Sequence, residues 1–438
     1  MLANTSDGNA RKIRRSPSSD RLLRLHSPSS RLYVVVLLPL FARSVAGFIF
    51  SGLHVVHLPL IRVFQPLMTR NSSQRLGQGH KSAMHNVPAY KFVHWPEPKL
   101  TVNATTQVMA SLSHLPWKVR FSVFFLSFLL NISRRRNGSV NRRLFNFFDL
   151  KAAPTPKPLD GVKSSDVIVD NSRNLWFRLF TPTISSSSTS LLPVVIYFHG
   201  GGFSFLSASS SWYDAVCRRL SRSIPSIVVS VNYRLCPEHR FPSQYNDGFD
   251  VLKFLDLNGD VLPEIADMSR CFLAGDSAGA NLAHHLAIRV CQEELRQVKV
   301  IGLVSIQPFF GGVDRTESEI RLDGAPITSV FNTDWVWEFF LPAGSDRDHE
   351  AVNVTGKNGL DISGMNFPDT IIFVGGLDPL LDRQRKYHEW LKKSGKKVEL
   401  IEYPNTIHAF YFFPELPPSP HQISRVKDFV NQRFSNMK

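Results

Sequence analysis

The chain has 438 residues, of which 43% are hydrophobic, and a formal net charge of +15 at pH 7. This length and apolar content suffice to bury the core of one large α/β domain and exclude a fibre or a disulfide-held scaffold. The four cysteines (Cys217, Cys236, Cys271 and Cys291) form no C-x-x-C pair, which argues against a zinc site or a redox motif and indicates reduced, mostly buried thiols.

The positive charge is concentrated in residues 1–108. This segment holds 14 Lys and Arg residues against three acids, whereas residues 109–438 hold 37 basic against 33 acidic residues. Because the larger part is nearly balanced, a nucleic-acid partner loses its main support. We expect no nucleic-acid binding.

Residues 1–108 are basic and Ser-rich, with apolar stretches at 32–42 and 45–61. About thirty residues precede the first stretch, which is long for a secretory signal. Arg43 interrupts the most apolar window of membrane-spanning length, so membrane contact is the weaker alternative. Two interpretations are favoured: an organellar transit peptide, or a stretch outside the working protein, which would then begin at Met109. We expect a cytoplasmic protein unless this extension directs it to an organelle.

Residues 109–160 are predicted to form an N-terminal cap, or lid, and a connector. Leu115–Ile132 is dominated by aromatic and aliphatic residues, but its almost wholly apolar part, Phe121–Leu130, is too short to span a bilayer. A helix packed over a core or an active site is the natural assignment. A second short helix is predicted at Asn141–Leu150, followed by the proline-rich connector Ala152–Pro158.

Residues 161–438 contain β-rich runs separated by helical patterns such as Tyr213–Ser221 and Arg383–Lys393. The runs are Asp166–Val169, Leu175–Phe180, Val194–Phe198, Ile227–Tyr233, Cys271–Ala274, Val300–Ile306, Thr370–Val374 and Val398–Tyr403. Most of the later runs are continuously apolar, as in parallel strands that are covered on both faces. The alternation predicts an α/β fold with a mostly parallel eight-stranded sheet and helices on both faces.

The segment Gly275-Asp276-Ser277-Ala278-Gly279 lies between an apolar run and a helix-like segment. It matches the G-x-S-x-G pattern of a nucleophile elbow, in which a serine occupies a strained turn between a strand and a helix. Small residues two positions before and after the serine are needed to leave room for this turn. Alone, the match could equally be a structural turn.

Two further residues follow predicted strands. Asp378 comes directly after Thr370–Val374, and His408 follows Val398–Tyr403. The chain order Ser277, Asp378, His408 is the nucleophile, acid, base order of α/β hydrolases. Each residue alone would be read as an ordinary turn or surface residue, but the three together predict a catalytic triad for acyl transfer.

A glycine run, His199-Gly200-Gly201-Gly202-Phe203, follows another predicted strand. Glycines there let backbone N–H groups approach a reacting carbonyl. An HGGG run after a strand is the esterase form of the oxyanion loop, so we expect Gly200, Gly201 and Gly202 to form the oxyanion hole with the amide of Ala278. A phosphate loop is disfavoured because no G-K-[ST] follows.

With these motifs, the chain resembles the plant carboxylesterase family, in the hormone-sensitive-lipase-like branch of α/β hydrolases that also holds the gibberellin receptors. The resemblance spans Met109 to the C-terminus, with no counterpart for 1–108. It is carried by HGGGF (199–203), NYRLCPEHRFP (232–242), GDSAGANLAHH (275–285), DWVWEFFLP (334–342), GGLDPLLD (375–382) and His408-Ala409-Phe410. Cys236 stands where alanine is usual in the family.

The resemblance implies an α/β-hydrolase core at 161–438 with a cap insertion around 311–345, and a serine carboxylesterase of small esters that needs no cofactor or metal. It also implies a substrate pocket that includes Phe203, Tyr213, Asn332 and Val336. The receptors of the family lack the catalytic histidine and have serine at the position of Gly202. Because this chain keeps both residues, an enzyme is favoured over a hormone receptor or a dehydratase of the same family.

Overall fold

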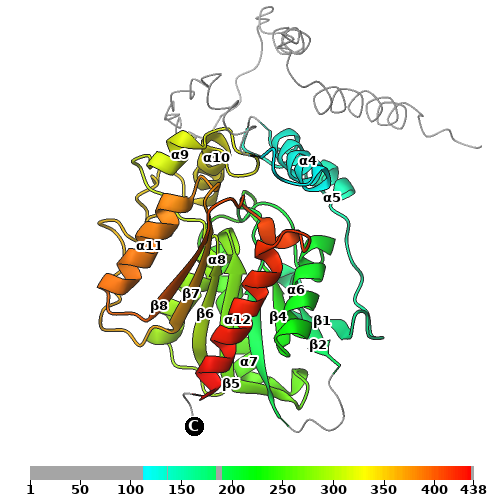
Figure 1. Ribbon diagram of the computed structural model, residues 1–438. Helices are drawn as coiled ribbons and strands as arrows, with labels where there is room; N and C mark the ends of the chain where they lie inside the picture. Colours follow the sequence, from blue (N-terminus) through cyan, green and yellow to red (C-terminus); the bar gives the residue numbers. More distant parts are fainter. Residues whose placement is uncertain (1–111, 136, 184–189, 436–438) are drawn as a thin grey trace, which may run out of the picture. The chain divides into compact units, whose positions relative to one another are not determined.

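A twisted eight-stranded sheet runs through the protein (Figure 1), whose computed structural model describes residues 112–135, 137–183 and 190–435. The strands are β1 (Val162–Asp170), β2 (Leu175–Pro182), β3 (Leu192–Phe198), β4 (Ile227–Asn232), β5 (Ala266–Asp276), β6 (Val300–Ile306), β7 (Asp369–Gly375) and β8 (Val398–Tyr403). Their order in the sheet is β1-β2-β4-β3-β5-β6-β7-β8. β2 pairs antiparallel with β1 and β4, and every other pair is parallel. The predicted fold class is confirmed.

Helices cover both faces of this sheet. The α-helices of the described residues are α4 (Trp117–Ser133), α5 (Arg142–Phe148), α6 (Ser211–Ser223), α7 (Ser243–Leu257), α8 (Ala278–Gln292), α9 (Glu317–Arg321), α10 (Val330–Phe340), α11 (Leu381–Lys393) and α12 (Pro418–Ser435), of which α6, α7, α8, α11 and α12 pack on the faces. The core on one face includes residues of α6 and α12, and the core on the other includes residues of α7, α8 and α11. Figure 1 shows α6 and α12 in front of the sheet, with α7 and α8 behind it.

Strand β3 shows why the apolar runs are continuous. Val194, Ile196 and Phe198 belong to the core on the α7 and α8 side, while Val195 and Tyr197 belong to the core on the α6 and α12 side. Successive side chains of a strand point to opposite faces, so a strand with both faces buried has no polar alternation. All seven residues of β3 are buried.

Helices α4 and α5, from the segment predicted to form a lid, lie with α9 and α10 beyond one end of the strands (Figure 1). α4 buries Val119, Val123 and Leu129, whereas Phe124 and Phe128 on the same helix stay partly exposed. No helix within the described ranges is both long and apolar enough to cross a membrane. The basic segment 1–108 lies outside the described residues, so its role and the proposed domain boundaries stay predictions.

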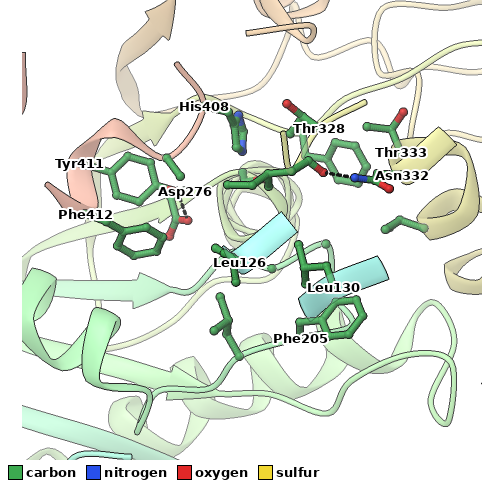
Figure 2. A pocket seen from close by; sticks show the side chains of 18 of the residues that line it. Leu126, Leu130, Phe205, Asp276, Thr328, Asn332, Thr333, His408, Tyr411 and Phe412 are labelled. Carbon is green, nitrogen blue, oxygen red and sulfur yellow. Dashed lines mark hydrogen bonds between the residues drawn. The ribbon is translucent and has the colours of Figure 1, made fainter. Parts of the chain in front are cut away.

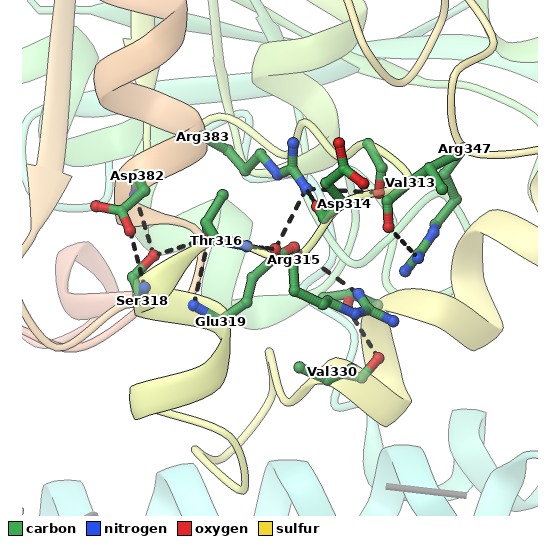
Figure 3. Close-up of polar contacts among 12 residues, drawn as sticks. Val313, Asp314, Arg315, Thr316, Ser318, Glu319, Val330, Arg347, Asp382 and Arg383 are labelled. Carbon is green, nitrogen blue, oxygen red and sulfur yellow. Dashed lines mark hydrogen bonds and ion pairs between the residues drawn. The ribbon is translucent and has the colours of Figure 1, made fainter. Parts of the chain in front are cut away.

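A polar network fastens the segment between β6 and β7 to the start of α11 (Figure 3). Thr316 caps α9 through a capping box with Glu319. The Ser318 backbone N–H donates to Asp382 at 2.8 Å, and Glu319 forms a buried ion pair with Arg383 at 3.3 Å. Because α11 begins three residues after Asp378, this network connects α9 to the loop that holds the candidate acid.

Candidate active site

Ser277 sits in a sharp turn between β5 and α8. Its backbone φ is +52° and its ψ is −118°, a combination that costs a residue with a side chain about 1–3 kcal/mol. The backbone holds this turn: Ser277 N–H donates to the Ile306 carbonyl at 2.8 Å, and the Ser277 carbonyl accepts from Phe309 at 3.0 Å. The Ser277 side chain makes no capping hydrogen bond to α8, so the hydroxyl is not used to hold the helix.

The two glycines of the motif are packed too tightly for any side chain. A Cβ on Gly275 would lie 2.4 Å from the Gly279 carbonyl carbon, and a Cβ on Gly279 would lie 1.9 Å from the Phe198 carbonyl oxygen. Real Cβ atoms do not approach backbone so closely, so any larger residue at either position would displace the turn. The turn therefore requires glycine at both positions, as the G-x-S-x-G pattern predicts.

Asp378 and His408 are brought together from the ends of β7 and β8. His408 Nδ1 lies 2.7 Å from Asp378 Oδ2, and both side chains are buried. The Leu380 backbone N–H donates to the second Asp378 oxygen at 3.0 Å. A carboxylate held in this way fixes the imidazole orientation and directs Nε2 away from the acid.

Two glutamines that the sequence did not single out complete this pair. Gln384 Nε2 donates to Asp378 Oδ2 at 3.0 Å, and Gln307 Nε2 donates to the same oxygen at 3.2 Å. Gln307 also accepts from the Ala409 N–H at 2.8 Å and so connects the acid to the loop of His408. Gln307 directly follows β6. Asp378 and His408 were predicted from their positions beyond the carboxyl ends of strands. The same signal could have pointed to Gln307.

Two backbone N–H groups of the oxyanion loop, together with that of Ala278, are free to donate hydrogen bonds to a ligand. Gly201 and Gly202 have φ values of +97° and +59°, and within the described residues their N–H groups and that of Ala278 have no acceptor. Gly200 differs from its prediction: its N–H donates to Tyr213 Oη at 2.7 Å and to Asp276 at 3.1 Å. Since that donor is already used inside the protein, Gly200 shapes the loop and the other three amides are the candidate oxyanion donors.

Asp276, the residue before Ser277, is a buried carboxylate surrounded by hydroxyl donors. It accepts from Tyr197 at 2.8 Å, from Tyr213 at 2.8 Å and from Tyr411 at 2.5 Å, in addition to Gly200 N–H. Burial raises the pKa of Asp276, although the tyrosine hydroxyls act in the opposite direction. The side chain of this elbow residue thus contacts β3, the oxyanion loop, α6 and the segment that follows His408.

A cavity opens above these groups and holds about 690 Å³ of space not filled by atoms, its mouth included. Both Ser277 and His408 line it, and they are 7% and 5% exposed. No hydrogen bond joins their side chains in the described part of the chain. Catalytic contacts of this kind often shorten only when substrate is bound.

Most of the expected pocket residues line this cavity: Tyr213, Asn332 and Val336 do. Phe203 does not. Its ring is fully buried and stacks on Phe340 with ring centroids 4.0 Å apart. The left-handed backbone of Phe203, with φ +56°, turns the chain directly after the glycine run, and the side chain packs into the core instead of the pocket.

The lid helix α4 supplies the apolar side of the cavity with Leu126 and Leu130 (Figure 2). In the same view, Asp276, Tyr411 and Phe412 lie at one end of the cavity and Asn332 at the opposite end. Apolar walls with few polar groups are typical of sites for small organic ligands.

All four cysteines are free, and three of them are buried. Among the residues that the structure describes, no group of three or more His, Cys, Asp or Glu side chains is arranged to hold a metal ion.

The sheet, the elbow and the cavity define a protein of the α/β-hydrolase class, and comparisons with known proteins agree. A family model described as the alpha/beta hydrolase fold matches residues 195–412. Among solved structures, an esterase of Pyrobaculum calidifontis superimposes with a TM-score of 0.56 and 27% sequence identity, covering 72% of this chain and 92% of that chain.

Two plant relatives show which branch of the α/β hydrolases the chain belongs to. Gibberellin receptor GID1C of Arabidopsis thaliana is 39% identical over 312 residues, which cover 69% of this chain and 90% of the receptor. Carboxylesterase 20 of the same plant is 37% identical over 284 residues, which cover 63% of this chain and 86% of the esterase. The chain belongs to the hormone-sensitive-lipase-like branch of the α/β hydrolases, with the plant carboxylesterases and gibberellin receptors.

Proposed function

We propose that this protein is a carboxylesterase that hydrolyses small carboxylic esters through an acyl-enzyme on Ser277. The observation that carries the proposal is the shared cavity. The strained serine, the imidazole held by Asp378 and the free amides of the oxyanion loop all border one apolar space. Esterases among the relatives and the solved structures give the proposal further support.

In the proposed reaction, His408 Nε2 takes the proton of the Ser277 hydroxyl as its Oγ attacks the ester carbonyl carbon. Asp378 keeps the imidazole in the tautomer with Nε2 unprotonated and stabilises the imidazolium that forms. The N–H groups of Gly201, Gly202 and Ala278 donate to the negative oxygen of the tetrahedral intermediate. The imidazolium then protonates the leaving alcohol, and water releases the acid by the same steps.

The principal test is the Ser277→Ala variant assayed with a short-chain aryl ester such as 4-nitrophenyl acetate. We expect kcat/KM to fall by at least about three orders of magnitude, because the nucleophile is lost while the fold is kept. The matched control is Ser211→Ala at the start of α6, away from the cavity lining. Turnover by a folded Ser277→Ala protein within tenfold of the wild type would refute the proposal.

A second candidate, a receptor for a small hormone, is favoured by the similarity to gibberellin receptors. His408 argues against it, since the family resemblance implies that the receptors lack this histidine. Calorimetry with a gibberellin and the ester assay on the same preparation separate the two. Tight binding of the diterpenoid acid without hydrolysis of any ester would favour the receptor.

A further inference from the structure

Arg134, the capping residue directly after α4, is a cation in the wall of the cavity. Its guanidinium lies over the Trp335 ring, 5.2 Å from the ring centroid, and its Nη2 donates to Asn332 Oδ1 at 2.5 Å. Burial lowers the pKa of Arg134 to about 10, so the side chain remains charged at neutral pH. None of the proposed catalytic steps uses this charge.

No carboxylate neutralises Arg134 within the described residues. Its hydrogen-bond partners are the Leu130 carbonyl at 3.2 Å and the amide oxygens of Asn131 and Asn332. The acid of α10, Asp334, pairs instead with Arg315 and Arg347. A partly buried cation that has only neutral partners is costly, and an anionic ligand offsets that cost.

The hydrogen-bond count of the guanidinium leaves donors for such a ligand. Of its five N–H groups, Nε–H and the two on Nη2 account for the three bonds, and the two N–H groups on Nη1 have no acceptor among the described residues. Asn332 is fixed as the acceptor because its Nδ2 donates to the Ile327 carbonyl at 2.9 Å. The amide oxygen is therefore turned toward the guanidinium.

We propose that Arg134 binds a carboxylate carried by the substrate, so that the physiological esters are monoanions with the carboxylate remote from the scissile bond. The proposal rests on the proposed esterase function and names its substrate class. A carboxylate matches one cation in charge, whereas a phosphate monoester carries nearly two negative charges. Arg134 is the single Lys or Arg among the described residues that line the cavity.

The position of the charge in the cavity agrees with this assignment. Asn332, and with it Arg134, lies at the end opposite the buried acid Asp276 (Figure 2). A ligand with its anionic group at Arg134 would keep that group away from Asp276, with Ser277 and His408 reaching the same apolar space. The anionic group of the ligand and the carboxyl group of Asp276 would thus lie at opposite ends of the cavity.

The test uses two matched ester pairs, because the carboxylate could be on either side of the ester. 4-Acetoxybenzoate and 4-acetoxybenzamide place the charge, or its neutral counterpart, on the alcohol side. Monophenyl adipate and phenyl hexanoate place it on the acyl side. The measured quantity is the ratio of kcat/KM for the anionic ester to kcat/KM for its neutral partner.

Arg134→Gln should lower this ratio by about tenfold or more in at least one pair, as expected when a charged hydrogen bond to the ligand is lost. Asn332→Asp should lower it as well, because the new carboxylate would neutralise Arg134 without removing it. The control is Arg135→Gln, which makes the same charge change at an exposed neighbour. This control should leave the ratio unchanged.

Equal ratios in the wild type, Arg134→Gln and Asn332→Asp for both pairs would overturn the inference while leaving the esterase proposal intact. If the wild type hydrolyses neither these four esters nor 4-nitrophenyl acetate, the esterase proposal fails instead. Calorimetry with 4-acetamidobenzoate, a stable analogue, then decides the anion site alone. A Kd at least about tenfold weaker in Arg134→Gln supports the site, and an equal Kd or no binding by the wild type overturns it.

Discussion

Gln307 Nε2 lies 3.2 Å from Asp378 Oδ2, the same oxygen that faces His408 Nδ1. The Gln307 Nε2 also donates to the Ile407 carbonyl at 3.1 Å, and its Oε1 accepts from Ala409 N–H. One glutamine side chain therefore touches the acid and both neighbours of the histidine in the chain. Its contacts can set how the imidazole is presented to Ser277 without Gln307 touching the substrate.

We predict that Gln307→Leu lowers kcat of ester hydrolysis by about tenfold to a hundredfold with a small change in KM, because the imidazole loses its fixed orientation. The pH dependence of kcat should shift as well, since the carboxylate loses a hydrogen bond. Steady-state measurements of kcat and KM at several pH values check both effects. A purely structural role would lower the unfolding midpoint and leave the pH profile of the folded fraction unchanged.

Asp378→Asn should abolish most of the activity while preserving the shape of the site. The amide cannot hold the imidazole in the required tautomer or stabilise an imidazolium, and comparable changes cost roughly 10⁴-fold in kcat. Steady-state kinetics with a saturating aryl ester measures the loss. An activity within tenfold of the wild type would remove Asp378 from the proposed triad.

Gly201→Ala should lower kcat by about a hundredfold, as when one oxyanion donor is lost. A Cβ at Gly201 would lie 2.3 Å from the Phe205 carbonyl oxygen, and φ there is +97°. Gly344→Ala is the matched control, because φ is +87° but no atom lies within 4 Å of its Cβ. If Gly201→Ala and Gly344→Ala had the same kcat, the oxyanion loop would have no specific part in catalysis, and this prediction would be wrong.

Burial raises the pKa of Asp276, so the folded protein binds this proton more tightly than the unfolded chain does. The resulting stability is complete below the ordinary pKa of an aspartate and is lost as pH rises through the raised value. The free energy of unfolding of the wild type minus that of Asp276→Asn should therefore fall as the pH rises above the ordinary pKa of an aspartate, about 4. Urea unfolding at several pH values measures it.

Asp260→Asn, in the short 3-10 helix Gly259–Val261 where Asp260 is exposed, provides the control for this pH series. The same charge is removed there without burial, so its difference from the wild type should stay flat over the same range. A difference for Asp276→Asn that rises with pH would contradict the sign derived from burial.

The central strands β3 to β7 could be predicted because both faces of the sheet are buried there, which makes these strands nearly continuous apolar runs. α7 shows where the same reasoning stops. Asp247 of α7 is fully buried because it pairs with Arg234 at 2.7 Å, and Gly248 lets α8 approach so closely that a Cβ would lie 2.7 Å from Leu286. A buried acid and a glycine hide the helical pattern.

Part of the candidate site could likewise be predicted from the sequence, and part of it could not. Ser277, Asp378 and His408 each follow a predicted strand, and parallel strands end at one edge of a sheet, so their proximity could be expected. The use of the Gly200 amide by Tyr213 could not, because Tyr213 comes from α6 and the contact depends on how that helix packs. Phe203 was misplaced for a related reason, since a left-handed φ turns its ring away from the cavity.

The tyrosine-surrounded carboxylate of Asp276 has a consequence for how charge is handled during turnover. The oxyanion loop, helix α6 and the segment after His408 converge on its two oxygens, through Gly200, Tyr213 and Tyr411. Dipoles that are already anchored need little reorientation when an oxyanion forms, which lowers the reorganisation energy of the chemical step. The fold thus keeps a buried carboxyl group at one end of the cavity, where it limits how far the loops around it reorient during the reaction.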